Sequence, residues 1–229
     1  MRRRLYGALK TIKFQPDELA YLALTSKPEH HVRDRLAWEL HKAGDVAARE
    51  WKRTDLAVFD KEHKPIALIE AKAMYSFEAD TTGPYHGVHM PKYEVSIKRD
   101  LDKAATLARQ EDAPGAEVFA LLVVTHVSDP VPRELRGLIK YGTYLRRPAD
   151  LKAAEQRIRK FLEPLGAVRR KRLVEGEAFE LRAMVDAWLC GPVGAVSKRA
   201  VSAGAAGGAA GHDEARAHTR VKGSRALGD

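Results

Sequence analysis

Three ionisable residues interrupt two apolar segments in the first third of the chain. Asp55 lies near the start of the segment 54–60, and Glu70 and Lys72 lie within the segment 66–74. Alternate residues of a strand share a face, so Glu70 and Lys72 point the same way among otherwise apolar side chains. Burying a charge is costly unless it is paired or bound to a metal ion. These residues therefore predict either a functional site or a buried ion pair.

The two acids are suited to hold a divalent cation. If the segments 54–60 and 66–74 pair as a hairpin through the charged turn 60–65, Asp55 approaches Glu70 across the ladder. Carboxylate oxygens are hard ligands that select Mg²⁺, or Mn²⁺ in its place, over zinc. A lysine beside such a site can activate a water molecule. The predicted chemistry is metal-assisted hydrolysis.

Structural explanations compete with this hypothesis. Glu70 can form a simple salt bridge with Lys72, and Asp55 can pair with Arg53. Glu50 is either a substitute acid for the site or a surface residue beside its basic neighbours. With these salt bridges alone the domain would be an ordinary α/β protein.

Helices and strands of regular spacing surround these residues. In chain order through residue 128 we expect a helix over 29–43, strands over 46–53, 54–60 and 66–74, a helix over 91–111 and a strand over 117–127. Pro28 and Gly44 bound the first helix in the usual asymmetric way. The strands 54–60 and 117–127 are apolar on both faces, which is typical of central strands.

Glu39 lies at the edge of the apolar stripe of the first helix. One interpretation is a boundary glutamate paired with Arg35 or another arginine. The other is a third carboxylate directed at the metal site, and the motif downstream favours this second interpretation. His126, near the end of the strand 117–127, is a further candidate because ligands gather at strand ends of α/β sheets.

The element order, with Asp55 on the second strand and Glu70-Ala71-Lys72 on the third, resembles the core of the PD-(D/E)xK nuclease superfamily. This superfamily includes many restriction endonucleases and several repair nucleases. The resemblance covers about residues 29–128 and departs from the family pattern at Thr54, where proline is expected. It implies a restriction-endonuclease-like αβββαβ core with a central mixed sheet flanked by helices.

The resemblance also implies a role for each residue. Asp55 and Glu70 would be carboxylate ligands of Mg²⁺, the backbone carbonyl of Ala71 would add an oxygen, and Glu39 would supply an outer or second-metal carboxylate. Lys72 would position or deprotonate the attacking water. The reaction implied is in-line hydrolysis of a DNA phosphodiester.

The composition agrees with a globular DNA-binding enzyme. The chain has 229 residues, of which 45% are hydrophobic and 31% charged. A net charge of +9 indicates a polyanionic partner, most simply nucleic acid, although a basic balance alone also fits ribosomal or membrane-surface proteins. Cys190 is the only cysteine, so we expect no disulfide and a reducing, cytoplasmic location. No apolar run approaches the ~20 residues that span a bilayer, so no membrane partner is expected.

The chain divides by composition into three parts. We expect an N-terminal extension over 1–28, with a short helix over 17–24, a nuclease domain over 29–192 and a flexible Ala/Gly-rich basic tail over 193–229. A glycine-containing loop over 76–91 is long enough to be functional and is expected to contact bases, together with residues 129–192.

The end of the nuclease domain should contain two helices and a hairpin. We expect helices over 133–140 and 151–162, and a closing hairpin of 167–174 with 179–189 around Glu175-Gly176, although its second arm also fits a helix. Basic residues of the second long helix and of this hairpin are predicted to contact the DNA backbone. They are Lys98, Arg99, Arg169, Arg170, Lys171 and Arg172.

The leading hypothesis is a restriction-type endonuclease that cuts double-stranded DNA, as a homodimer because one such site cuts one strand. One alternative is a structure- or damage-directed repair nuclease such as a junction resolvase. Another is a DNA-binding module that keeps the fold without cleavage.

Overall fold

The computed structural model describes residues 1–80, 90–110 and 113–194. Most of the predicted loop over 76–91 and nearly all of the predicted tail over 193–229 lie outside these residues. No helix within the described part of the chain is long and apolar enough to cross a membrane.

The centre of the fold is one mixed sheet of six strands in the order β1-β2-β3-β4-β6-β5. The strands are β1 (Val46–Trp51), β2 (Thr54–Phe59), β3 (Pro65–Tyr75), β4 (Glu117–Val127), β5 (Val168–Ala178) and β6 (Leu181–Cys190). Within this sheet β3 and β4 pair in parallel, and the other neighbours are antiparallel. The predicted α/β class, with a central mixed sheet flanked by helices, is confirmed.

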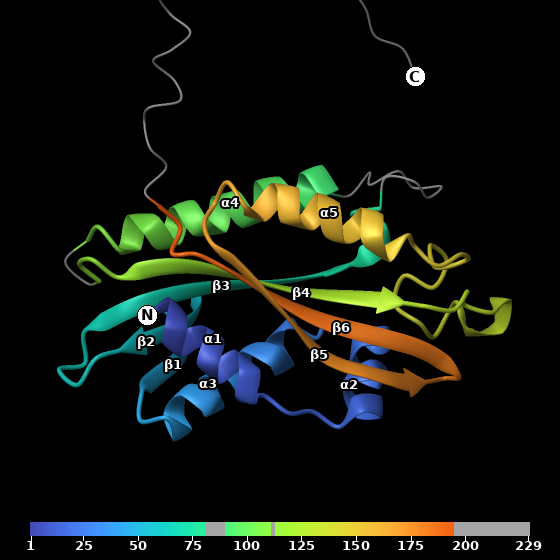
Figure 1. Ribbon diagram of the computed structural model, residues 1–229, viewed down its shortest axis with the longest axis horizontal. Coiled ribbons are helices and arrows are strands. Elements are labelled where there is room, and N and C mark those ends of the chain that lie inside the picture. The colour runs from blue at the N-terminus through green and yellow to red at the C-terminus, as the bar shows by residue number, and fades with distance from the viewer. Residues whose placement is uncertain (81–89, 111–112, 195–229) are drawn as a thin grey trace, which may run out of the picture. The chain divides into compact units, whose positions relative to one another are not determined.

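Helices cover both faces of the sheet (Figure 1). The helices are α1 (Arg2–Thr11), α2 (Pro16–Thr25), α3 (Glu29–Lys42), α4 (Met90–Leu107) and α5 (Leu151–Leu162), with short 3-10 turns η1 (Ser76–Glu78) and η2 (Arg133–Leu135). Apolar residues of α1, α2 and α3 pack on one face, and those of α4 and α5 pack on the other. Because side chains alternate along each strand, every central strand contributes to both cores.

The first 28 residues pack against the sheet. Leu5 and Leu9 of α1 and Leu19 of α2 are fully buried in the same core as Leu36 of α3. Pro16 at the start of α2 and the acidic residues that follow it favour a helix there. The sequence predicted only the short helix over 17–24, because the basic residues at the start of α1 masked its apolar stripe.

Two expectations for the second half of the chain are wrong. The segment 133–140 forms only η2 followed by turns rather than a helix. The closing hairpin is formed by two strands that turn at Phe179 and Glu180, with φ of 56° and 59°, and Glu175-Gly176 lies within β5. Two adjacent residues of positive φ make the tight turn that suits the twist of a β-hairpin.

Gly176 has a packing role in β5 and is not a turn residue. A Cβ added to Gly176 would lie 2.3 Å from the carbonyl oxygen of Pro16, so only glycine allows the start of α2 to approach this strand. The amide of Glu177 donates to the carboxylate of Asp17 at 2.9 Å, which fixes the same contact. The glycine therefore ties the N-terminal helices to the sheet.

We predict that Gly176→Ala lowers the free energy of unfolding by about 1–3 kcal/mol, because the added methyl group overlaps backbone atoms that cannot rotate away. Urea unfolding measures the change. The matched control is Gly7→Ala on the exposed side of α1, where nothing lies within 4 Å of the new Cβ. There, alanine should stabilise the protein by about 0.5–1 kcal/mol. Equal effects at both positions would contradict the packing role of Gly176.

Candidate active site

A tight hairpin between β1 and β2 positions Asp55. Lys52 and Arg53 form its turn with φ of 48° and 67°, and Trp51 pairs with Thr54. Thr54 is buried, so the start of β2 is held within the structure and Asp55 follows at a fixed place. Residues other than glycine with a backbone in the left-handed region carry strain, and such residues cluster at functional sites.

Asp55 and Glu70 face each other across β2 and β3. Leu56 pairs with Ile69 in the antiparallel register, and the next pair in that register is Asp55 with Glu70. Directly opposed residues share a face of the sheet, so both carboxyl groups lie on the face covered by α4. The amide of Ala71 donates to Asp55 Oδ2 at 2.7 Å, which brings the backbone of β3 to the same carboxylate.

The surroundings of the Glu70 carboxyl group favour its protonated form. Glu70 is buried, with 9% of its surface exposed. Burial, the negative charge of Asp55 and a hydrogen bond to Asp55 raise the pKa of Glu70 to about 8, with Asp100 adding to the effect and Lys72 opposing it. A carboxyl group that is poorly solvated and lies beside another negative charge holds its proton more tightly.

Lys72 lies on the same face of β3 as Glu70 and pairs with an acid from α4. Its Nζ is 2.7 Å from Asp100 Oδ2, and Lys103 also reaches Asp100, at 3.6 Å. Although burial opposes the change, the hydrogen bond and charge of Lys72 lower the pKa of Asp100. The salt bridge of Lys72 with Glu70 that the sequence suggested is replaced by one with Asp100.

Arg33 of α3 provides a cation beside Asp55. Its buried guanidinium lies 3.8 Å from Asp55, 3.2 Å from Glu50 and 3.0 Å from Asp34. Burial works against its charge, but these acids raise the pKa of Arg33. Arg33 therefore brings Glu50 to the edge of the site, where the sequence had left Glu50 as either a substitute acid or a surface residue.

Glu39 lies among other residues. Its carboxylate accepts a hydrogen bond from Thr11 at 2.9 Å and pairs with Lys42 at 2.8 Å. These contacts join α3 to the end of α1, and Lys42 above all lowers the pKa of Glu39. The structure thus brings together Asp55, Glu70 and the backbone of Ala71, but it does not bring Glu39 to them.

A groove with a volume of about 870 Å³ opens beside Glu70, between the β1–β2 turn and α4. Five basic side chains and one carboxylate besides Glu70 line it: Lys52, Arg53, Lys98, Arg99, Lys103 and Asp102. Lys98 and Arg99, which the sequence predicted to contact DNA, are therefore next to the candidate catalytic pair.

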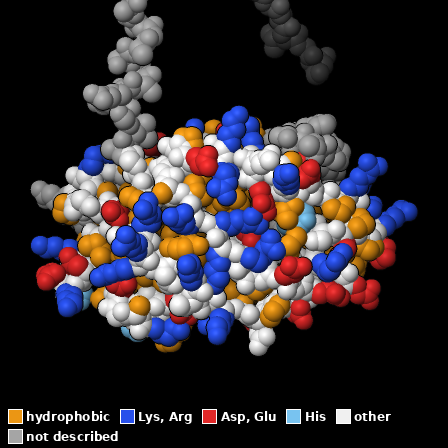
Figure 2. Space-filling view, viewed as in Figure 1, with side chains coloured by type: hydrophobic (Ala, Val, Ile, Leu, Met, Phe, Trp, Pro, Cys, Tyr) orange, Lys and Arg blue, Asp and Glu red, His pale blue; other side chains and the backbone are white. Residues whose placement is uncertain are grey.

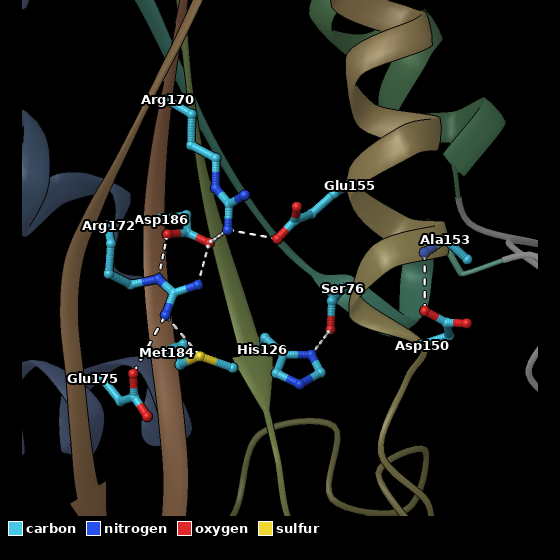
Figure 3. A network of polar contacts seen from close by, with 10 residues as sticks. All are labelled: Ser76, His126, Asp150, Ala153, Glu155, Arg170, Arg172, Glu175, Met184 and Asp186. Atoms are coloured by element: carbon cyan, nitrogen blue, oxygen red, sulfur yellow. Dashed lines mark hydrogen bonds and ion pairs between the residues drawn. The ribbon is translucent and has the colours of Figure 1, made fainter.

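The basic run at 169–172 has a different environment (Figure 3). Arg170 donates to the buried carboxylate of Asp186 at 2.8 Å and pairs with Glu155 of α5 at 2.5 Å. Arg172 contacts the other oxygen of Asp186 at 2.5 Å and Glu175 at 3.5 Å. These two arginines join β5, β6 and α5 around one buried acid.

Lys171 also has a structural partner. Its Nζ donates to the carbonyl oxygens of Leu9, Lys10 and Ile12 at 2.8–3.0 Å, which satisfies the end of α1. Arg169 is exposed. On the face seen in Figure 2, Lys and Arg side chains are scattered with Asp and Glu side chains between them. Of the four residues of the run, only Arg169 is displayed as the sequence predicted.

His126 is buried at the end of β4, away from the acidic pair. Its Nδ1 lies 2.8 Å from Ser76 Oγ (Figure 3). Burial, with a smaller effect of Arg172, lowers the pKa of His126, while Asp186 opposes the change. Glu70 pairs with Ala120, so His126 is six residues farther along β4. The suspected strand-end ligand is a structural histidine here.

The donor set of the site fits a magnesium ion with water in its remaining positions. Among residues 1–80, 90–110 and 113–194, no group of three or more His, Cys, Asp or Glu side chains is arranged to hold a metal ion. Mg²⁺ commonly takes only one or two carboxylates, and water and substrate phosphate complete its shell. The amide and carbonyl of a strand residue point to the same edge, so the Ala71 carbonyl faces the strand that holds Asp55.

Sequence reasoning missed Arg33 and Asp100. Asp100 comes three residues after Ile97 in α4 and lies on the buried side of that helix. A buried acid needs a cationic or hydrogen-bonding partner, so its position could have predicted one. Arg33 immediately follows Val32 and gave no comparable signal.

Comparison of the chain with protein-family models, with curated proteins and with solved structures finds no match.

We predict that Glu70→Gln stabilises the metal-free protein at pH 8 by about 2–4 kcal/mol. Between the ordinary pKa of 4.5 and about 8, the folded protein holds a proton at Glu70 that the unfolded chain has lost. The contribution of Glu70 to stability is therefore complete at low pH and disappears as the pH rises through this range. Urea unfolding at pH 5 and pH 8, values near the two ends of this range, measures the difference.

The control is Glu62→Gln in the exposed β2–β3 turn, which should leave the pH dependence of the wild-type protein unchanged. If Glu70→Gln also keeps that dependence, the protonated state of Glu70 is disproved.

Proposed function

We propose that this chain is a Mg²⁺-dependent nuclease of the PD-(D/E)xK type that hydrolyses DNA phosphodiester bonds. The observation that supports this proposal is the opposed pair Asp55 and Glu70, which are hydrogen-bonded on one face of the sheet with Lys72 beside them. Poorly solvated acids of this kind are expected where a cation is to be bound.

The order of elements also supports the proposal. The run α3-β1-β2-β3-α4-β4 contains an antiparallel meander of three strands, and α4 then connects β3 to the parallel strand β4. This order is compatible with the αβββαβ order expected of a restriction-endonuclease-like core. The acids lie on the second and third strands of that order, as the resemblance implies.

The chemistry proposed for the site uses few residues. Asp55, Glu70 and the Ala71 carbonyl would hold Mg²⁺, which when bound acidifies water and stabilises the negative charge of the phosphate in the transition state. Lys72 donates to the attacking water or to a phosphate oxygen. Holding the ion requires Glu70 to lose its proton, so binding should become tighter as the pH rises towards 8.

Lys72 has a partner that a substrate can replace. A phosphate oxygen that enters beside Lys72 competes with Asp100, and Asp100 keeps Lys103 as an alternative partner at 3.6 Å. Arg33 remains near Asp55 and limits the negative charge of the pair when Glu70 ionises. The site therefore has a cation available for the phosphate without a large rearrangement.

The groove between the β1–β2 turn and α4 is the proposed path of the DNA backbone. Lys52, Arg53 and Lys98 line it together with Glu70, so phosphates bound there lead directly to the reactive position. Arg170 and Arg172 have buried acidic partners in a separate network, and we do not retain them as DNA contacts.

A second candidate function is a DNA-binding module of the same fold that does not cleave. It is favoured by the ion pairs themselves, because Lys72 with Asp100 and Arg33 with Asp55 form a set that needs no metal ion to be stable. Restriction-type cutting of both strands by a homodimer, and cutting confined to branched or damaged DNA, are two forms of the first candidate. Cleavage assays on plasmid and on branched DNA distinguish all three.

We predict that Asp55→Ala and Lys72→Ala each lower Mg²⁺-dependent DNA cleavage by about 10²–10⁴-fold, since each removes a group that acts on the reacting phosphate or water. Product formation from supercoiled plasmid measures the rate. Lys61→Ala, in the exposed β2–β3 turn, is the matched control and should cut at the wild-type rate. Absence of Mg²⁺-dependent cleavage of any DNA by the wild-type protein would leave the binding module.

We predict that the double variant Lys98→Ala, Arg99→Ala weakens DNA binding and reduces the slope of log affinity against log salt by about 0.9 for each phosphate that the variant no longer neutralises. Fluorescence anisotropy with EDTA present measures this without cleavage. Arg170→Ala should leave the slope unchanged, yet it should lower the free energy of unfolding by about 2 kcal/mol or more, because Asp186 is buried. If Arg170→Ala reduced the salt slope and the double variant did not, the DNA would bind at β5 instead.

A further inference from the structure

A second hollow, with a volume of about 400 Å³, is lined by Lys72, which does not line the basic groove. It is bounded by the end of β3, by η1, by the first turns of α4 and by the segment 141–144. Glu70 lines the first hollow and Lys72 lines the second, so the two hollows meet the candidate site from different sides. Ligand pockets for small molecules have volumes of about 300–1,000 Å³, so the space suits one nucleotide.

Aromatic rings form much of its wall. Phe77, Tyr93, Tyr141 and Tyr144 all line the hollow. The rings of Phe77 and Tyr144 are stacked, with centroids 5.7 Å apart and planes 6° apart, and Tyr141 meets Phe77 nearly edge-on. Tyr144 is 37% exposed, so this stack reaches the surface. Rings fixed in this way provide the flat apolar surface on which a nucleobase stacks.

The charges around the hollow favour an anion. Lys27, Lys72 and Lys92 line it. Lys140 lies nearby, with its Nζ 5.7 Å from the centre of the Tyr141 ring, and burial together with the charge of Lys27 lowers the pKa of Lys140. Amino groups gathered in this way attract phosphate.

Glu78 is the carboxylate among the described residues of the wall, and it is already engaged. It is buried and accepts hydrogen bonds from the amide of Tyr75 at 2.7 Å and from the hydroxyl of Tyr93 at 3.1 Å. The Glu78 carboxylate therefore holds Tyr75 and Tyr93 in place. The ammonium groups of the lysines are the charges that face a ligand in the hollow. Aromatic faces beside ammonium groups form a site for a base joined to a phosphate.

We propose that this hollow receives one unpaired nucleotide of the substrate, with its base against the aromatic rings and its phosphate near Lys72. The inference rests on the proposed function, because Lys72 is the residue assigned to the reacting phosphate. A base inside a duplex is stacked and paired on both sides and must be extruded to enter such a space. The substrate class is therefore nucleic acid with an unpaired nucleotide beside the cut, in a single strand or at a branch, and intact duplex is the poorer ligand.

The test compares a labelled single strand with the duplex of the same sequence by fluorescence anisotropy in EDTA. The wild-type protein should bind the single strand more tightly. Tyr144→Leu should weaken single-strand binding by about 10-fold, within the range for one base–aromatic stack, and leave duplex binding unchanged. Tyr144→Phe keeps the ring and should restore the affinity, which separates loss of the stacking surface from loss of the fold.

Tyr21→Leu is the matched control, because Tyr21 is an exposed tyrosine stacked on Phe179 in another part of the molecule. It should bind both DNAs as the wild-type protein does.

A competition experiment separates recognition of a base from recognition of phosphate alone. A deoxynucleoside monophosphate should displace the strand weakly, and inorganic phosphate at the same concentration should displace it less. Displacement by inorganic phosphate as complete as that by the nucleotide would overturn recognition of the base. Displacement by the mononucleotide as strong as by an unlabelled strand would overturn a strand as the ligand.

The outcomes of this test and of the nuclease proposal are distinguishable. Equal binding of single strand and duplex, unaffected by Tyr144→Leu, overturns the nucleotide pocket even if Asp55→Ala abolishes cleavage. A single-strand preference that Tyr144→Leu removes supports the pocket, and full cleavage by Asp55→Ala would then overturn only the proposed chemistry.

Discussion

Two carboxyl groups that face each other across neighbouring strands cannot both be negative in a buried place unless a cation lies beside them. Asp55 and Glu70 are under this constraint, and a proton on Glu70, whose pKa rises to about 8, satisfies it in the metal-free protein. The structure around the pair keeps the two groups together at this cost. The buried Thr54 holds the start of β2, and the amide of Ala71 holds the Asp55 carboxylate. If the pair holds a divalent ion, as proposed, a proton and that ion would compete for one place, and protonation, stability and metal binding would be linked.

Helix α4 covers the face of the sheet on which the two carboxyl groups lie. Its Asp100 neutralises Lys72 in the substrate-free protein, and its apolar residues Ile97 and Leu101 pack on the sheet beside the pair. The helix lies between the basic groove and the aromatic hollow and contributes to both walls. A phosphate in the groove and a base in the hollow would both lie within reach of the Glu70–Lys72 strand face.

Strand periodicity was sufficient to predict the centre of the sheet and the meeting of Asp55 with Glu70, because side-chain alternation and a short charged turn fix both. Partners distant in sequence were not predictable. The run at 169–172 resembles a DNA-binding surface until Asp186 and Glu155 are known to lie against it, and nothing local records that proximity. Glu39 likewise accepts a hydrogen bond from Thr11, because α1 packs on α3. The basic residues at the start of α1 had made this helix hard to predict. Turns at Phe179 and Glu180 lack the glycine or asparagine that usually marks them.

The turn of Lys52 and Arg53 has the same unusual chemistry, with Glu50 before it also at positive φ, 55°. Left-handed backbone costs about 1–2 kcal/mol for each residue with a side chain, and Asn-Gly would remove most of that cost. Selection for thermal robustness alone would thus drive both turn positions towards Asn and Gly. Two long cationic side chains occupy the turn instead, and both line the basic groove. In a library screened only for folding, these two positions should drift first, and their drift would report how strongly function restrains them.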